Sequence, residues 1–123
     1  MDLIQIMKAL GDETRLRILN LLSKGALCVC EIEQILSINQ SNASRHLNKL
    51  TVAGLIKNEK RALYVYYKMN DDTLEEFPFL KDFICMELNK IEKCKVDLIK
   101  LEKYKSSGIS CDDLKDGKGC LHN

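Results

Sequence analysis

The middle of the chain limits the fold more than any other segment, because it has the pattern of a helix that presents one face to a core. Between residues 40 and 53, Ala43, Leu47 and Leu50 recur at the i, i+4, i+7 spacing that puts apolar side chains on one side of a helix. A short turn separates this segment from a second helical pattern at about residues 30–36. Two helices joined by so short a turn predict a helix-turn-helix.

A hairpin is expected next. Segments 55–59 and 63–69 favour two strands, because the second alternates between apolar and polar side chains. Lys60, Arg61 and Ala62 would form the tip between them. A helix-turn-helix followed by a basic-tipped hairpin is a winged helix, and we therefore expect a mainly α fold with a small β-hairpin.

Two further helices are predicted before the helix-turn-helix. Leu3, Ile6, Met7 and Leu10 recur at the spacing of one face of a helix. Asp12 is a good N-cap for a second helix, whose apolar residues form more than one stripe and which should be buried on several sides.

The apolar pattern of the last predicted helix suggests that two copies of the chain form a dimer. Residues 78–104 form one long predicted helix, because apolar residues recur in steps of three or four. A single winged helix of this size has too little core to cover both this helix and the first one. We therefore expect a symmetric homodimer through the first and last helices. The expected seam on the last helix consists of Phe77, Leu80, Ile84, Leu88, Ile91, Cys94, Leu98 and Leu101.

Size and composition are those of one domain with an extension. The chain has 123 residues, of which 46% are hydrophobic. Residues 1–105 would form the winged helix and dimerisation domain, and the polar, glycine-rich residues 106–123 a flexible C-terminal tail. No apolar run reaches the roughly 18 to 20 residues of a membrane span, and the acidic start of the chain is unlike a signal peptide. We expect a cytoplasmic protein with no membrane contact.

Basic residues concentrate in the middle of the chain. The formal net charge is only +1, but residues 41–68 contain six basic residues and one acidic residue, Glu59. Such a segment fits the backbone of double-stranded DNA, which helix-turn-helix proteins read with their second helix. We expect His46, at the edge of the apolar face, to be a partly buried packing residue. The expected DNA contacts are Gln40, Ser41, Asn42, Ser44, Arg45, Lys49, Lys60 and Arg61.

Two of the six cysteines open the first helix of the helix-turn-helix. Cys28 and Cys30 would point about 200° apart on a regular helix, so both sulfurs can hold one metal ion only if the helix start is irregular. A ligand there would act on the helix that positions the recognition helix. Cys28 and Cys30 could instead be small buried side chains without a ligand. For Cys94, in the last predicted helix, this packing role is the interpretation that we prefer. In a reducing compartment, thiols or metal ligands are expected rather than structural disulfides.

Three separated stretches resemble the ArsR/SmtB family of metal-responsive repressors. They are residues 8–18 (KALGDETRLRI), 27–32 (LCVCEI) and 41–47 (SNASRHL). The second stretch is similar to the arsenic-responsive branch, whose third-helix site binds trivalent arsenic or antimony through cysteine thiolates. The resemblance implies a homodimeric repressor of metalloid-resistance genes, with no organic cofactor, that leaves its operator DNA when As(III) or Sb(III) binds.

The chain departs from that pattern at one important position. The arsenic-sensing version usually has a third cysteine three residues after the second, where this chain has Glu33. Trivalent arsenic prefers sulfur, so Cys111 or Cys120 of the tail is the candidate for a third thiolate; these two could also clamp a second ion or be unengaged. The family's histidine and carboxylate site on the last helix is absent from the sequence, and Ala62 stands in the wing where the family often has glycine.

Other functions remain open at this point. Cadmium and lead also favour thiolates, and a cysteine pair can respond to oxidation, so a repressor with one of these signals is the alternative. A thiol-disulfide oxidoreductase is disfavoured, because that class is expected to carry Cys-x-x-Cys near a strand-helix-strand unit. No glycine-rich phosphate loop surrounds any cysteine, as an arsenate reductase would need. We therefore expect no enzymatic activity and no catalytic residues.

Overall fold

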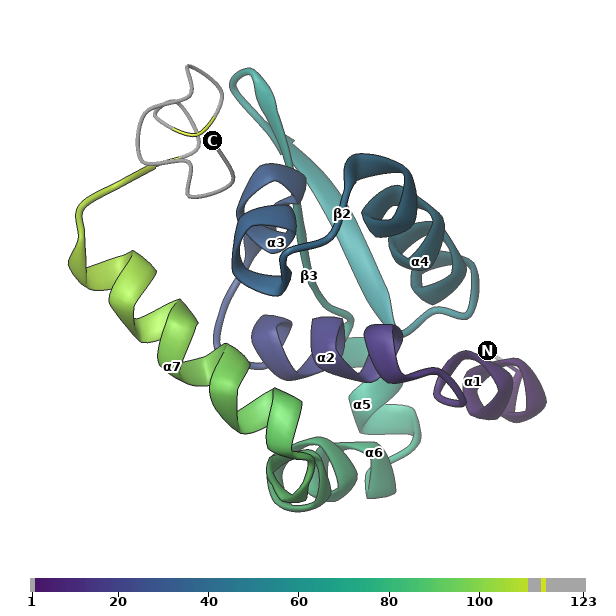
Figure 1. The fold of residues 1–123 in the computed structure, drawn as a ribbon. Helices are drawn as coiled ribbons and strands as arrows, with labels where there is room; N and C mark the ends of the chain where they lie inside the picture. Colours follow the sequence, from purple (N-terminus) through teal and green to yellow (C-terminus); the bar gives the residue numbers. More distant parts are fainter. Residues whose placement is uncertain (1, 111–113, 115–123) are drawn as a thin grey trace.

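Helices dominate the computed structural model, and a small antiparallel sheet stands beside them (Figure 1). The structure describes residues 2–110 and Leu114. This is the predicted winged helix, mainly α with a hairpin wing. Its elements are α1 (Leu3–Ala9), α2 (Glu13–Leu22), β1 (Leu27–Cys28), α3 (Val29–Leu36), α4 (Gln40–Val52), β2 (Ile56–Arg61), β3 (Tyr64–Met69), α5 (Asp71–Glu76), α6 (Phe79–Asp82), the π-helical turn η1 (Phe83–Glu87), the 3-10 turn η2 (Leu88–Lys90) and α7 (Glu92–Ser106).

Short polar residues explain where four of the helices begin. The side chains of Asp2, Asp12, Asn39 and Asn70 each accept a hydrogen bond from a backbone N–H in the first turn of the following helix, at 2.8–3.2 Å. The predicted N-cap at Asp12 is thereby confirmed. Ser37 ends α3 in the left-handed conformation, with φ of 58°, and so starts the turn into α4.

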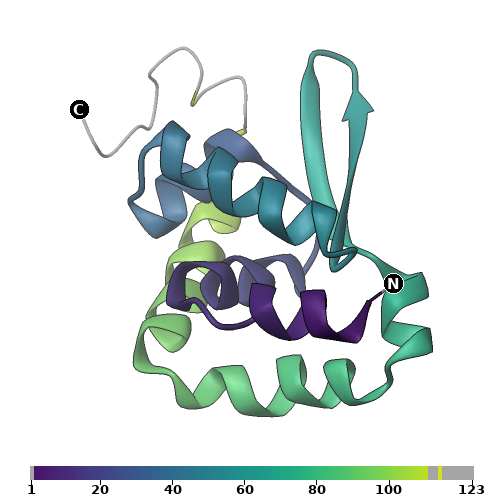
Figure 2. The same ribbon diagram turned by 90° about the vertical axis from the view of Figure 1, so that its right-hand side faces the viewer.

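The sheet has three strands in the order β1-β3-β2, one more than expected. β1 pairs antiparallel with β3 through Leu27 and Cys28, which lie opposite Tyr67 and Tyr66. Two residues are too few to show an alternating pattern, so the sequence did not reveal this strand. The hairpin of β2 and β3 stands upright beside the helices in Figure 2.

The tip of the wing is placed one residue later than expected. Arg61 pairs with Tyr64, which leaves Ala62 and Leu63 as the connection. Ala62 has φ of 54°, in the left-handed region that favours glycine. Ala62 therefore occupies a position where a Cβ atom strains the backbone.

Replacing Ala62 with glycine should relieve that strain. Left-handed backbone costs a non-glycine residue roughly 1–2 kcal/mol, and the added freedom of glycine in the unfolded chain takes back about 0.4–1 kcal/mol. Ala62→Gly should thus raise the free energy of unfolding by about 0.5–1 kcal/mol in urea denaturation. Ala62→Val, which is branched at Cβ, should lower it, and equal effects of the two substitutions would show that the turn is unstrained.

The predicted single last helix is wrong, because the chain is interrupted at Ile91. The backbone there is extended (φ −84°, ψ 122°), between η2 and α7. Figures 1 and 2 show α6 and the two turns after it running along one end of the molecule and α7 leaving in a different direction. Apolar residues continue in steps of three and four through this break, so the pattern alone does not reveal it.

The apolar residues of this region are used within the same chain. Leu80, Leu88 and Cys94 are fully buried in the single core, together with Ile84 and Leu101, and α7 packs on α2 and α3. The inference that this seam requires a second copy of the chain is therefore wrong. The packing assignment for Cys94 is confirmed, and burial raises the pKa of its thiol.

A buried ion pair fixes α7 on α2. Arg17 donates two hydrogen bonds to the Asp97 carboxylate, from Nε at 2.7 Å and Nη2 at 2.9 Å, and Asp97 is completely buried. Asn20 adds a hydrogen bond from Nδ2 to the Cys94 carbonyl oxygen at 3.0 Å. Among the described residues no helix is long and apolar enough to cross a membrane. Most of the predicted tail, residues 106–123, lies outside the described part of the chain.

Candidate cysteine sensor and nucleic-acid interface

Cys28 and Cys30 lie on the two sides of a strand-to-helix junction. Cys28 ends β1 and is the N-cap of α3, with extended backbone (φ −86°, ψ 167°) and 1% exposure. Cys30 lies in the first turn of α3 and is half-buried. Placing both residues on a regular helix would separate their directions by about 200°, but Cys28 is outside the helix. The irregular helix start that a shared ligand requires is thus already built into the fold.

The sulfur atoms are not equivalent. Cys28 is disulfide-bonded in this structure, whereas Cys30, Cys85 and Cys94 are free thiols. No group of three or more histidine, cysteine or acidic side chains is arranged to hold a metal ion among the residues that are described. Of the predicted metal set, the structure therefore places only Cys28 and Cys30, and Cys111 and Cys120 lie outside the described residues.

Glu31 connects the cysteine pair with the last helix. One carboxylate oxygen accepts the Cys28 backbone N–H at 2.9 Å, and the other accepts a hydrogen bond from the Tyr104 hydroxyl of α7. Glu31 is buried, and with Cys28 it forms a capping box at the start of α3. The Cys-x-x-Glu spacing could have indicated this cap, but no local pattern marks Tyr104 as its partner. The end of α7 is thereby held at the start of the candidate sensor.

Helix α3, which begins at the cysteine pair, packs directly on α4. The predicted inward residues Ile32, Ile35 and Leu36 of α3 lie in the same buried cluster as Leu47 and Leu50 of α4. Protein cores are close-packed, so a displacement of α3 has to be accommodated by α4. This contact connects the cysteine pair mechanically with the predicted DNA-reading surface.

The polar face of α4 is open to solvent, as the sequence pattern predicts. Arg45 Nη2 donates to Asn42 Oδ1 at 3.1 Å, so these two side chains lie together on that face. Ala43, Leu47 and Leu50 fill the opposite, buried face. The exposed residues of α4 include all six predicted DNA contacts on this helix, namely Gln40, Ser41, Asn42, Ser44, Arg45 and Lys49.

His46 is buried between α4 and the start of α2, with 5% exposure, as expected of a packing residue. Its Nδ1 lies 3.2 Å from Arg15 Nη1 and 3.6 Å from Asp12 Oδ2, and its Nε2 lies 3.3 Å from Arg45 Nη2. Burial lowers the pKa of His46, although the Asp12 carboxylate acts in the opposite direction. Arg15, for which we predicted no role, also donates from Nε to the Ala9 carbonyl oxygen at 2.7 Å. The cluster fastens α4 to the ends of α1 and α2.

The two predicted cations of the wing differ in their surroundings. Arg61 Nη2 lies 2.6 Å from Glu59 Oε1, and the guanidinium carbon lies 4.9 Å from the centre of the Tyr66 ring. Lys68 also approaches Glu59, at 3.5 Å, and the hydrogen bond from Arg61 is the main cause that lowers the pKa of Glu59. Lys60 is exposed and makes no ion pair within the described residues. Lys60 is therefore better placed than Arg61 to meet a phosphate.

Comparison with known proteins agrees with this geometry. Residues 12–58, which span the start of α2 through the start of the wing, match the family model described as bacterial regulatory protein, arsR family. A cadmium resistance transcriptional regulatory protein CadC homolog of Staphylococcus aureus is 38% identical over 77 residues, which cover 62% of this chain and 64% of the relative. The arsenical resistance operon repressor of Escherichia coli is 44% identical over 68 residues, which cover 54% and 58%. The chain thus matches less than two thirds of the length of these two relatives.

Other relatives are matched over most of their length. An uncharacterized HTH-type transcriptional regulator of Methanocaldococcus jannaschii is 43% identical over 79 residues, which cover 63% of this chain and 89% of that protein. Reduced HlyU from Vibrio cholerae has a TM-score of 0.57 at 30% identity, over 68% of this chain and 88% of that chain. The homodimeric winged helix-turn-helix domain Mb0332 from Mycobacterium bovis has a TM-score of 0.59 at 26% identity, over 73% and 84%. The chain belongs to the ArsR family of bacterial regulatory proteins, which are DNA-binding regulators of transcription.

Proposed function

We propose that this protein is a cytoplasmic, homodimeric repressor of metalloid-resistance genes, which leaves its operator when As(III) or Sb(III) binds to Cys28 and Cys30. The observation that supports this most is the position of the two cysteines at the start of α3, the helix that packs on the recognition helix α4. Thiolates are the ligands that soft metalloids prefer. When a thiol bonds to the arsenic of arsenious acid, one hydroxyl group of the acid leaves as water. Because Cys28 is disulfide-bonded in this structure, that disulfide must be reduced first.

We assign the third thiolate to the tail, to Cys111 or Cys120. The Tyr104 hydroxyl contacts Glu31, so α7 ends beside the start of α3. Cys111 follows Ser106, the last residue of α7, by five residues, and five residues span at most about 17 Å at roughly 3.3 Å per residue. Cys111 can therefore return to the cysteine pair without any movement of α7.

Two other inducers are outcomes of the same experiment. The S. aureus relative is named for cadmium resistance, and a cysteine pair can also respond to thiol oxidation. Reduced protein on fluorescent operator DNA should be titrated with arsenite, cadmium, lead, zinc and the thiol oxidant diamide. We expect arsenite to release the DNA at the lowest concentration. If only cadmium, lead or diamide releases the DNA, that agent is the inducer in place of arsenite. If none of the agents releases the DNA, the proposal is refuted.

The DNA interface is proposed to have two parts. The first half of α4 would contact base edges through Gln40, Ser41, Asn42 and Ser44, since this is how the second helix of a helix-turn-helix enters the major groove. The phosphate contacts are assigned to Arg45 and Lys49 of α4 and to Lys60 and Arg61 of the wing.

Removing a cation from the wing should weaken binding to all DNA sequences alike. Lys60→Ala should lower the slope of log affinity against log salt by about one unit. Arg61→Ala should have a smaller effect, because Arg61 is paired with Glu59, and Glu59→Gln should tighten binding by releasing Arg61 and Lys68. Fluorescence anisotropy at several salt concentrations measures the slopes. Unchanged slopes in both alanine variants would remove the wing from the interface.

The dimer is proposed to form through apolar side chains that the single chain leaves exposed. Ile6 and Leu10 of the predicted first-helix surface are buried in the chain's own core, but Leu3, Ile4 and Met7 of α1 are exposed. Phe79 and Met86 are exposed on α6 and η1. We assign the dimer contact to these exposed apolar side chains, because exposed apolar surface can mark an interaction site.

Charging that surface should separate the subunits. The wild type should sediment as a dimer at micromolar concentration, with recognition helices about 34 Å apart, and Ile4→Glu/Met86→Glu should sediment as a folded monomer. Since a monomer contacts one half-site only, its operator affinity should fall by more than about a hundredfold. Ile99→Glu, which charges an exposed apolar residue of α7, should remain dimeric. A monomeric wild type would contradict the assembly.

A further inference from the structure

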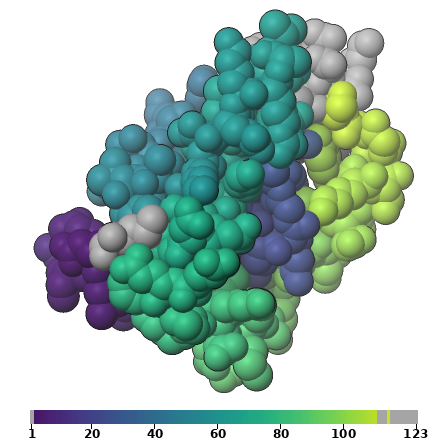
Figure 3. Space-filling view, turned by 180° about the vertical axis from the view of Figure 1, so that it is seen from behind, coloured from purple at the N-terminus to yellow at the C-terminus, as the bar shows by residue number. Residues whose placement is uncertain are grey.

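A hollow lies on the face opposite to the view of Figure 1, and its lining includes neither Cys28, Cys30 nor any residue of α4. It encloses about 410 Å³ between the loop after α2, the end of β3, α5 and the segment from α6 to η1. In Figure 3 the blue loop that follows α2 lies beside the green of α5 and α6 on this face. Pockets for small organic ligands commonly have volumes of about 300–1,000 Å³. The size is therefore sufficient for a compact ligand.

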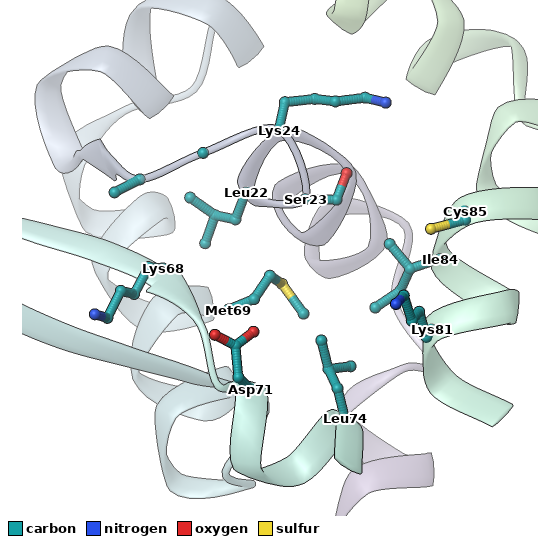
Figure 4. Close-up of a pocket in the computed structure, with 12 residues that line it drawn as sticks. Leu22, Ser23, Lys24, Lys68, Met69, Asp71, Leu74, Lys81, Ile84 and Cys85 are labelled. Carbon is teal, nitrogen blue, oxygen red and sulfur yellow. The ribbon is translucent and has the colours of Figure 1, made fainter. Parts of the chain in front are cut away.

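The floor of the hollow is apolar. Leu22 and Ile84 are buried in the core beneath it, and Met69 and Leu74 are half-buried. Figure 4 shows Met69 at the centre, with Leu22 above it and Leu74 below it. These side chains come from four separate elements, so an apolar ligand body would contact all of them at once.

The rim carries an excess of positive charge. Lys24, Lys68 and Lys81 face one carboxylate, Asp71. Lys68 points away from Met69 in Figure 4 and approaches Glu59 of the wing. Lys24 and Lys81 form no ion pair within the part of the chain that is described. In Figure 4 Lys24 lies at the top of the hollow and Lys81 at its right, both away from Asp71 at the lower left.

We propose that this hollow, which Cys85 also lines, binds a small organic anion with an apolar body, as a second effector site distinct from Cys28 and Cys30. The anionic group lies between Lys24 and Lys81, beside Ser23, and the apolar body lies over Met69 and Leu74. Asp71 fixes the orientation, because it repels the anionic end of the ligand. A bound ligand contacts Met69 at the base of the wing and also the segment from α6 to η1. It therefore connects the wing with the segment that carries the proposed dimer surface.

The methionines of the protein allow a direct test. Met69 lies in the hollow, whereas Met7 and Met86 belong to the proposed dimer surface, so their signals report binding of the ligand at that surface instead. Reduced full-length protein labelled with ¹³C-methyl methionine should be titrated with octanoate and, as a matched cation, octyltrimethylammonium. We expect saturable shifts of the Met69 methyl signal with octanoate at millimolar concentration or below. The signals of Met7 and Met86 should stay in place, and the cation should have no effect on Met69.

Charge removal on the rim completes the test. Lys24→Gln and Lys81→Gln should each weaken octanoate binding by about threefold, as expected for a partly exposed ion pair. Lys95→Gln removes an equal charge from the exposed surface of α7 and should leave binding unchanged. Equal shifts of Met7, Met69 and Met86, equal binding of the cation, or unchanged affinity in both rim variants would each overturn the proposal.

Discussion

Replacing Cys28 or Cys30 with serine should leave the protein on its operator at arsenite concentrations that release the wild type. Serine keeps the size of the side chain but removes the thiolate that arsenic requires. The variants should stay folded and dimeric, because the hydrogen bond from the Cys28 backbone N–H to Glu31 is retained. Operator binding by reduced protein, followed by fluorescence anisotropy during an arsenite titration, measures the effect.

The size of the effect follows from linkage. Release by ten- to a hundredfold needs a coupling free energy of only about 1.4–2.8 kcal/mol, and DNA must weaken metalloid binding by the same factor. Both cysteine variants should lose this coupling almost completely. Cys85→Ser and Cys94→Ser are the controls and should still release DNA. If the Cys28 and Cys30 variants release DNA as the wild type does, the sensor lies elsewhere.

The same titration identifies the third ligand. Cys111→Ser and Cys120→Ser keep Cys28 and Cys30, so they should retain partial metalloid binding. We expect one of them to lower arsenite affinity strongly. If neither variant changes the affinity, two thiolates are sufficient and the assignment of the third ligand to the tail is refuted, while the role of Cys28 and Cys30 stands.

Asp97→Ala should be the most destabilising single substitution among those considered. The carboxylate is completely buried and accepts two hydrogen bonds from Arg17. Its removal leaves a guanidinium largely enclosed without a counter-charge, which typically costs about 3–5 kcal/mol. Urea denaturation of the reduced protein measures this loss in the free energy of unfolding.

Two comparisons separate the buried charge from simple loss of contact. Arg17→Met/Asp97→Leu removes both charges and should recover most of the stability, since apolar replacement of a buried pair is often neutral. Lys93→Ala breaks the exposed pair between Lys93 and Glu13, which are 2.9 Å apart, and should cost less than about 1 kcal/mol. A cost below about 1 kcal/mol for Asp97→Ala would show that Arg17 finds other partners or water.

The sequence predicted those parts of the fold that are specified by neighbouring residues. The spacing of Ala43, Leu47 and Leu50 defined the buried face of α4, and Asp12 defined the start of α2, because both depend on contacts within a few turns. The break at Ile91 was missed, since it is set by the direction that α7 takes to reach α2 and α3. Spacing within one segment contains no information on that direction.

The candidate site was predictable to a similar extent. The cysteines themselves were evident, but their placement on the two sides of a helix start depends on β1, which forms only by pairing with Tyr66 and Tyr67. The contact between Tyr104 and Glu31 joins residues 73 positions apart. Such contacts arise from the packing of the whole domain and leave no periodic signal in the sequence.

The interruption at Ile91 also affects how this regulator can evolve. On one side of it, Phe79 and Met86 face outward, and on the other side Cys94, Asp97 and Leu101 are enclosed within the subunit. If the dimer forms as proposed, substitutions at these exposed positions would change which copies of a duplicated gene associate, with little cost to the fold. Two paralogues would then form separate dimers and keep the contact between α7 and α3, because that contact is encoded in a different part of the chain.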